Sequence, residues 1–241
     1  MLDAARDLLL GGACVGCAAP GRALCRACHA TLHPCPAPAW PSPAPAGLTA
    51  PWAASAYAGT VRAMILAHKE RGVLALADPL GELLAAAVDA ALGDLLGPAS
   101  SSASLLLVPV PSRPATVRQR GHDPTANLVA AAARRLSATG LAARSVPLLR
   151  ARRGVADQSG LDAAARRANL AGAFRLHPTA LRALARRREP VRVVVCDDVL
   201  TTGATAAEAQ RAVRSVGLPA LAVVAVAATR RRTPGAGTGS G

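Results

Sequence analysis

The clearest chemical pattern in the sequence is a pair of carboxylates followed by small and hydroxylated residues. Asp197 and Asp198 come directly after the apolar run VRVVVC. The turn that follows contains Thr201, Thr202, Gly203, Ala204 and Thr205. Small residues let backbone N–H groups approach a phosphate closely, and threonine hydroxyls add donors. The carboxylates repel a phosphate, so their partners must differ, and sugar hydroxyls and Mg²⁺ are suitable. The pattern predicts a site for a phosphorylated sugar or nucleotide.

A second pattern consists of two Cys-x-x-Cys pairs near the N-terminus. They are formed by Cys14 and Cys17, and by Cys25 and Cys28. Four thiolates in two such turns satisfy the tetrahedral geometry of a structural Zn²⁺. The nearby Cys35, His29 and His33 are alternates for the fourth ligand, and a disulfide framework is the rival that an intracellular setting disfavours. Few large apolar residues precede residue 36, so we expect this module to need its metal to fold.

The elements that position the carboxylates are a strand and a helix. Residues 191–199, VRVVVCDDV, predict a buried strand, and TAAEAQRAVRSVG predicts a helix ended by Gly217. The small-residue turn would then lie at the carboxyl end of a strand and at a helix N-terminus. Both places favour phosphate binding in α/β proteins.

The rest of the chain predicts an α/β fold. Strands are expected near residues 52–59, 104–110, 145–150 and 221–229, and helices near 61–69, 79–96 and 124–138. Asp78 is the expected N-cap of the second helix, with Pro79 at its first position. Alternation of strands and helices from residue 104 onward indicates a parallel sheet with helices on both faces. The expected organisation is a zinc module over 1–35, a Pro/Ala-rich connector over 36–51, a main domain over 52–230 and a disordered tail over 231–241.

Charge and composition restrict the function. The formal net charge is +14, and residues 101–241 hold 22 basic and 7 acidic residues, which is a net charge of +15. This favours a polyanionic ligand, although a solvated arginine-rich surface explains the charge equally well. Aromatic residues are only 2% of the chain, which counts against single-strand binders built on stacked bases. No apolar run approaches the roughly 18 residues that span a bilayer, and the N-terminus is a poor signal peptide, so a cytoplasmic protein is expected.

The strand, the two acids and the TTG-x-T turn resemble the PRPP-binding motif of type I phosphoribosyltransferases. The resemblance implies that Asp197 and Asp198 are catalytic and contact the ribose hydroxyls of PRPP. It also implies that residues 201–205 bind the 5′-phosphate and that Mg²⁺ accompanies PRPP. A phosphoribosyltransferase-like parallel sheet flanked by helices, with a small Cys₄ zinc module, is therefore the expected fold.

A narrower resemblance covers residues 14–230. A Cys₄ module, AHKERG, VPVP with a basic RQRG segment, QSGL…RRANLAGAF and the PRPP motif follow one another as in the ComF competence-protein family. These bacterial proteins are associated with DNA uptake. The resemblance makes residues 109–121 the pyrophosphate loop, with Arg113, Arg118 and Arg120 as diphosphate ligands. Lys69 and Arg71 are further candidate phosphate contacts, or cations that complement a helix end.

Two further segments bear on this resemblance. The family continues the basic loop with RG-F-N-Q, whereas this chain has His122, Asp123 and Pro124 after Gly121. Residues 151–169 match a family signature and are expected to form a mobile loop that closes over the site. The residues of this loop that could act on the substrate are Gln158, Ser159, Arg166, Arg167 and Asn169. Asn169 could equally serve only packing and turns.

Three functions are compatible with these patterns. The first is transfer of phosphoribose from Mg-PRPP to an acceptor that the sequence does not name. The second is a binding protein on the same fold that engages single-stranded DNA or DNA-uptake proteins through its basic surface. The third is an adaptor without catalysis that keeps a structural zinc.

Overall fold

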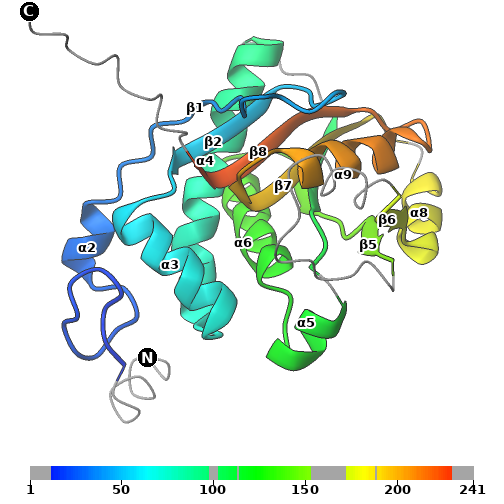
Figure 1. Cartoon of the computed structure of the whole chain (residues 1–241). Coiled ribbons are helices and arrows are strands. Elements are labelled where there is room, and N and C mark those ends of the chain that lie inside the picture. Colours follow the sequence, from blue (N-terminus) through cyan, green and yellow to red (C-terminus); the bar gives the residue numbers. More distant parts are fainter. Residues whose placement is uncertain (1–11, 98–102, 113, 153–171, 188, 230–241) are drawn as a thin grey trace, which may run out of the picture.

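The structure is a computed structural model, and it describes residues 12–97, 103–112, 114–152, 172–187 and 189–229. The expected tail over 231–241 lies outside these residues, as does nearly all of the expected closing loop over 151–169. Figure 1 shows a central sheet with helices packed against it.

The central sheet has six strands in the order β1-β2-β8-β7-β3-β4. They are β1 (Ala37–Pro38), β2 (Pro51–Ala56), β8 (Ala220–Ala228), β7 (Val191–Leu200), β3 (Ser104–Pro109) and β4 (Ala143–Ser145). Every neighbouring pair is parallel except β1 with β2, which is antiparallel. A separate antiparallel pair joins β5 (Leu149–Ala151) to β6 (Phe174–Leu176). The α/β class and the parallel sheet are therefore confirmed.

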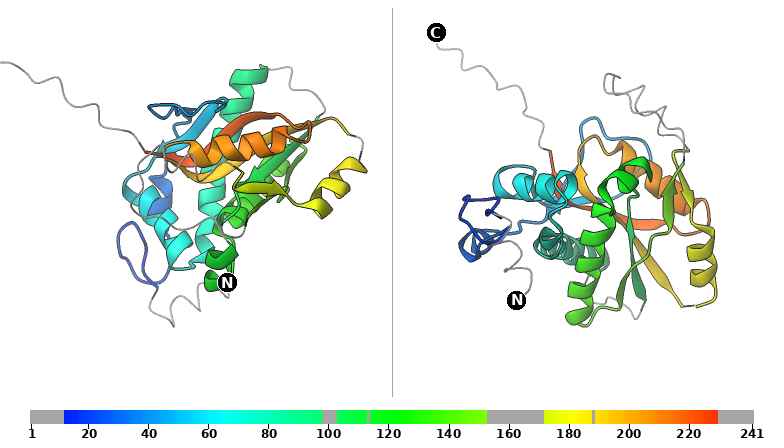
Figure 2. Two further views of the ribbon diagram at one scale, coloured as in Figure 1. Left: turned by 45° about the vertical axis from the view of Figure 1, so that its right-hand side comes forward. Right: turned by 90° about the horizontal axis from the view of Figure 1, so that it is seen from below.

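Helices cover both faces of the sheet, as the alternation of elements predicts (Figures 1 and 2). The helices are α2 (Arg26–Ala30), α3 (Gly59–Glu70), α4 (Ala77–Leu96), α5 (Pro114–Arg120), α6 (Pro124–Ala138), α8 (Pro178–Ala185) and α9 (Ala204–Arg214). Helices α4 and α6 pack on one face and α9 packs on the other. Strand β3 shows why: Leu105 and Leu107 enter the first core, and Leu106 and Val108 enter the second.

One helix start differs from its expectation. Asp78 is not the N-cap of α4, because the helix begins at Ala77 with Leu76 as its N-cap. A 3-10 turn over Leu74–Leu76 leads directly into α4, so the chain is already helical before it reaches Asp78. Leu76 is fully buried and fixes this entry. Asp78 instead lies in the first turn, where it suits the helix dipole and accepts a hydrogen bond from Arg134 at 2.9 Å.

Two short segments also fold differently from the expectations. Residues 145–150 do not form one strand but divide between the end of β4 and the start of β5. The expected basic loop after β3 is helical over most of its length, as α5. Pro114 opens that helix, where its missing N–H costs nothing.

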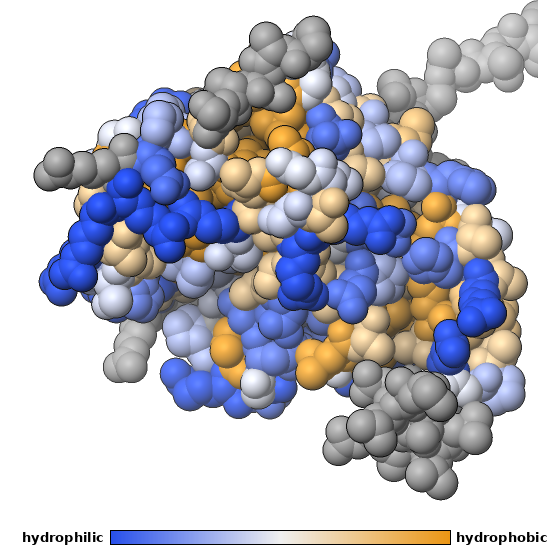
Figure 3. All heavy atoms as spheres, turned by 180° about the vertical axis from the view of Figure 1, so that it is seen from behind, coloured by the Kyte–Doolittle hydropathy of each residue, from blue (hydrophilic) through white to orange (hydrophobic). Residues whose placement is uncertain are grey.

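The N-terminal cysteine-containing segment packs against the main body of the protein. Ala23 is buried in the core that α3 and α4 share, and Val15, Leu24 and Leu32 pack around it. Among the described residues, no helix has both the length and the apolar character needed to cross a membrane. On the face opposite that of Figure 1, hydrophilic side chains lie among smaller hydrophobic patches (Figure 3).

Candidate functional site

The two loops of the expected PRPP site meet at the carboxyl edge of the parallel sheet. Strand β3 pairs with β7 so that Pro109 lies opposite Cys196, one residue before the carboxylate pair. Val110 continues this contact, because its N–H donates to the Cys196 carbonyl at 2.8 Å. The start of the expected pyrophosphate loop therefore lies beside Asp197 and Asp198.

Lys69 and Asp198 form an ion pair across the site. The Nζ of Lys69 lies 2.6 Å from Oδ2 of Asp198, and the Asp198 residue is only 5% exposed. The other Asp198 oxygen accepts a hydrogen bond from the N–H of Val199 at 2.8 Å. The structure thus places Lys69, a candidate phosphate ligand, directly on one of the carboxylates. Whether it also meets a phosphate stays a prediction.

The electrostatics of the three charged groups are linked. Burial and the neighbouring Asp198 carboxylate raise the pKa of Asp197 well above its usual range, although Lys69 opposes this. Burial alone would lower the pKa of Lys69, but the charge and hydrogen bond of Asp198, together with the charges of Asp197 and Glu70, outweigh it, so the pKa of Lys69 is raised. Lys69 therefore neutralises one of the two negative charges. Ionisation of the Asp197 carboxyl in the folded protein costs free energy.

The raised pKa of Asp197 predicts a stabilising substitution. Asp197→Asn keeps an oxygen for the hydrogen bond that Asp197 Oδ1 accepts from the Asp198 N–H, and it removes the charge. At neutral pH we expect Tm to rise by a few degrees, since about 1 kcal/mol shifts Tm by ~2–4 °C in a chain of this size.

The gain in Tm from Asp197→Asn must depend on pH. A carboxyl whose folded pKa is raised favours folding while it is protonated, and this contribution is lost as the pH rises from the usual carboxyl pKa through the raised value. The difference in Tm between variant and wild type should therefore be small near pH 4 and grow towards neutral pH. Thermal melts across this range test it, and a difference that shrinks with rising pH would contradict it.

The turn after β7 contains a glycine in a left-handed backbone conformation at the start of a helix. Gly203 has φ of 72°, in the left-handed region that favours glycine, and it is the N-cap of α9. It has no side chain with which to cap the first turn, where the N–H groups have no partner within the helix. Thr202 accepts a hydrogen bond from the N–H of Ala204 at 3.4 Å. Thr201 and Thr202 are exposed, Thr205 is partly buried, and all five turn residues lie together at one sheet edge.

The Pro/Ala-rich connector packs on this turn, which the sequence analysis missed. A Cβ placed on Gly203 would lie 2.9 Å from Pro41 and 3.0 Å from Leu48. Gln210 of α9 is 2% exposed and holds the same segment by two hydrogen bonds to the backbone of Thr49. The connector is thus fixed along the turn at residues 201–205. We call residues 36–51 the strap.

The arginines predicted to contact phosphates differ in their surroundings. Arg120 pairs with Glu70, the residue after Lys69 at the end of α3, so it already has a partner. Arg118 and Arg71 are exposed, and the structure leaves their expected phosphate contacts as predictions. Arg113 lies outside the described residues. So do Gln158, Ser159, Arg166, Arg167 and Asn169.

His122 and Asp123, which follow the basic segment, have structural roles. Asp123 is the N-cap of α6, where it accepts from the Ala126 N–H, and it also accepts from the Ser112 hydroxyl at 2.9 Å. His122 lies within hydrogen-bonding distance of the Arg120 and His68 carbonyls. An Asp followed by Pro at a helix start was the available signal for this cap. Asp123 therefore holds the expected pyrophosphate loop to the beginning of α6.

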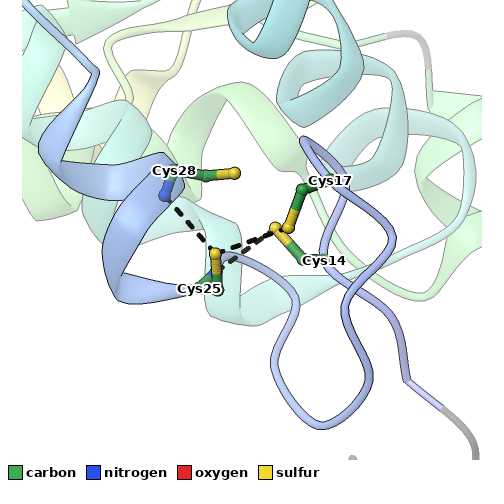
Figure 4. A group of neighbouring side chains, drawn as sticks. All are labelled: Cys14, Cys17, Cys25 and Cys28. Carbon is green, nitrogen blue, oxygen red and sulfur yellow. Dashed lines mark hydrogen bonds between the residues drawn. The ribbon is translucent and has the colours of Figure 1, made fainter.

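The four cysteines of the two Cys-x-x-Cys pairs converge at one point (Figure 4). Their sulfur atoms all lie within 4.8 Å of one another, and those of Cys17 and Cys25 are 3.6 Å apart. Four thiolates around Zn²⁺ would be separated by about 3.8 Å, given Zn–S bonds of about 2.3 Å. The donor set and its spacing thus fit a metal such as zinc. His29 instead lies 3.3 Å from Glu82, and neither it nor His33 or Cys35 belongs to the cluster.

The thiols of this cluster differ in their pKa values. Burial alone would raise the pKa of Cys14, but backbone N–H groups, led by that of Cys25, donate to its sulfur and lower it to about 6. Hydrogen bonds with Cys25, Cys17 and Cys14 raise the pKa of Cys28 to about 12. By contrast, Cys196 is fully buried, and burial raises its pKa, so it behaves as a small core residue.

The fold and the sites define an α/β protein with a mostly parallel sheet and a four-cysteine cluster that could bind a metal. No family model matches the chain, and no curated protein matches it either.

Proposed function

We propose that this protein is a phosphoribosyltransferase-like protein of the ComF type. It binds Mg-PRPP in the cytoplasm and transfers phosphoribose to an acceptor, in the setting of DNA uptake. The four cysteines hold a structural Zn²⁺. The observation that carries the proposal is the placement of the carboxylate pair and the TTGAT turn, of which Thr201 and Thr202 are exposed, at one edge of a parallel sheet, with the start of the basic segment beside them.

Each group has a chemical task in this proposal. The turn at residues 201–205 and the first turn of α9 bind the 5′-phosphate through backbone N–H groups. Asp197 and Asp198 accept hydrogen bonds from the ribose hydroxyls and hold the sugar in place. Arg113, Arg118 and Arg120 bind the diphosphate, since guanidinium groups form paired hydrogen bonds with phosphate oxygens. Mg²⁺ supplies charge neutralisation of the departing diphosphate when it is bound with PRPP.

Lys69 makes the carboxylate pair usable. Two adjacent carboxylates without a counterion would resist binding a substrate that carries many negative charges. The contact of Lys69 with Asp198 removes part of that repulsion before PRPP arrives. Asp197 is less buried as a residue than Asp198, and it is the more accessible of the two for a ribose hydroxyl.

Calorimetric titration of Mg-PRPP into zinc-loaded protein tests the proposal. Wild type should show saturable binding. Asp197→Asn should bind Mg-PRPP up to about 30-fold more weakly, which is the effect of losing a charged hydrogen-bonding partner. Because the same variant is expected to be the more thermostable protein, weaker binding could not be attributed to unfolding. Absence of heat at millimolar Mg-PRPP with wild type would overturn the proposal.

A second candidate function has an observation of its own. Exposed arginines gather on β5, β6 and α8 and on the residues that directly follow β5 and α8; they are Arg150, Arg152, Arg175, Arg182, Arg186 and Arg187. Such a group suits a nucleic-acid backbone. Salt-sensitive binding of single-stranded DNA that is equal in wild type and Asp197→Asn, without PRPP binding, would favour this function.

A further inference from the structure

A buried histidine connects two of the elements that frame the candidate site. His68 lies in the last turn of α3 and is only 1% exposed. The next residue, Lys69, is the cation that contacts Asp198. A buried imidazole needs hydrogen-bond partners within the protein, and the chain supplies one for each ring nitrogen of His68.

Both of these partners are backbone carbonyl oxygens. The Nδ1 of His68 lies 3.1 Å from the oxygen of Val73, just beyond α3, and its Nε2 lies 3.1 Å from that of Pro124, the first residue of α6. A carbonyl oxygen only accepts hydrogen bonds, and a neutral imidazole has a single N–H, so only the imidazolium donates to both. In the neutral ring, one nitrogen lone pair would face a carbonyl oxygen in a place that is closed to solvent. The geometry therefore suits a ring that carries two protons.

The carbonyl of Pro124 belongs to the segment that fixes the expected pyrophosphate loop. Asp123, one residue earlier, caps α6 and accepts a hydrogen bond from the Ser112 hydroxyl of that loop. On the other side, the His68 ring holds the chain just after α3, whose last turn also carries Lys69. His68 thus joins the Lys69 end of α3 to the loop that would bind the diphosphate.

A second histidine strengthens this connection. The ring centroids of His68 and His122 are 6.0 Å apart, and Nε2 of His122 is 3.4 Å from the His68 carbonyl oxygen. Its Nδ1 is 3.0 Å from the carbonyl oxygen of Arg120. His122 is partly exposed and the contact of its Nε2 is the longer one, so a neutral ring with one N–H serves there. The requirement for two protons therefore applies to His68.

Other charged and titratable groups surround this connection. The 3-10 turn over Leu74–Leu76 carries none, and Asp78 of α4 is exposed and pairs with Arg134 of α6. The remaining groups are Lys69, Glu70 and Arg71 at the end of α3, Arg120, His122 and Asp123 before α6, and Asp197 and Asp198 at the end of β7. The acceptors that the His68 ring itself meets are the two carbonyl oxygens, and hydrogen bonds to both favour the protonated ring.

We propose that His68 is a positioning residue, which in its doubly protonated form clamps the end of α3 to the start of α6. The clamp consists of its contacts with Val73 and Pro124, and it fixes Lys69 relative to the pyrophosphate loop before Mg-PRPP binds. Loss of one ring proton removes one of the two bonds, which loosens the clamp and weakens binding. The inference rests on the proposed function, because the clamped groups are those assigned to the diphosphate and to the carboxylate pair.

NMR spectroscopy of the wild-type protein tests the protonation directly. Near about pH 6.5, the His68 ring should show two N–H proton signals, because burial and hydrogen bonding slow their exchange with water. Cross-peaks to Val73 and Pro124 assign these signals. The exposed His177 should show none. A single ring N–H signal for His68 would overturn the inference and leave the proposed function standing.

Titration of Mg-PRPP into wild type and His68→Gln, between about pH 6 and about pH 8.5, tests the effect on binding. Glutamine carries its donors on one nitrogen, so it serves one carbonyl at every pH. Wild type should bind about tenfold more tightly at the acid end, which corresponds to one buried hydrogen bond. The ratio of affinities should fall towards unity as the pH rises and His68 loses its second proton. Ionisation of the ligand and of Asp197 affects both proteins alike and cancels in this ratio.

His177→Gln is the matched control, because His177 is exposed and its side chain does not cap α8. Its affinity for Mg-PRPP should equal that of wild type at every pH. A ratio of wild type to His68→Gln that stays constant across the range indicates a merely structural role and would overturn the inference alone. Failure of wild type to bind Mg-PRPP at any pH would overturn the proposed function, and the effect of the clamp on binding with it. If His68→Gln does not fold, the N–H signals of wild type still decide the protonation of the clamp.

Discussion

Cys25→Ser is expected to lose its zinc and to lower the free energy of unfolding by about 4 kcal/mol or more, as removal of a structural metal does. Cys25 lies at the centre of the cluster: its thiol contacts that of Cys17, its N–H donates to the Cys14 sulfur, and its sulfur caps α2. Because a serine hydroxyl can still cap α2, the substitution removes a metal ligand and leaves the helix cap in place. Metal analysis and thermal melting measure the two effects.

The destabilisation should extend beyond the cluster itself. Ala23, Val15, Leu24 and Leu32 belong to the core that α3 and α4 form with the sheet, so unfolding of the cysteine segment uncovers part of that core. Chelation of the metal from wild type should give the same lowered Tm as the variant.

Cys35→Ser is the matched control, since Cys35 is exposed and lies outside the cluster. It should keep one zinc per chain and the Tm of wild type. Full zinc content in Cys25→Ser would show that the four cysteines are not the ligand set. Zinc loss in Cys35→Ser as well would point to a different fourth ligand.

Gly203→Ala is expected to cost about 2–5 kcal/mol, from two separate causes. An alanine at φ of 72° carries a backbone penalty of about 1–2 kcal/mol. Its Cβ would also lie 2.9 Å from Pro41 and 3.0 Å from Leu48, which forces the strap away from the turn at a typical cost of about 1–3 kcal/mol. Urea unfolding measures the loss.

The chain offers a close control for this experiment. Gly217 has φ of 76°, but a Cβ added there meets nothing within 4 Å. Gly217→Ala should therefore show the backbone penalty alone, at about 1 kcal/mol. Equal losses in the two variants would contradict the packing of the strap on Gly203. Weaker binding of ribose 5-phosphate is expected for Gly203→Ala and not for Gly217→Ala.

The sequence predicts much of the site because its signals are local. The apolar run, the two acids and the small-residue turn lie within fifteen consecutive residues, and a strand followed by a helix is the only arrangement that uses them all. The cysteine spacing is similarly short, and the structure brings all four sulfur atoms together as expected. Helix α6 was predicted with the bounds that the structure shows.

The missed features depend on contacts between distant residues. Lys69 and Asp198 are 129 residues apart, and Thr49 and Gln210 are 161 apart, so no local pattern indicates either contact. A proline-rich composition describes the stiffness of the strap but not the surface on which it lies. The predicted start of α4 was wrong for a similar reason. Burial of Leu76 determines where the helix begins, and the preference of Asp for N-cap positions does not.

The position of β8 within the sheet has a consequence for how the chain reaches its native state. The last described strand lies between β2 and β7, so residues 51–56 cannot pair in the main sheet until residues 220–228 arrive. Contacts this far apart in sequence close slowly, since a long loop must be ordered first. Until then the incomplete sheet exposes strand edges, and chaperones that shield such edges would be needed most at this stage.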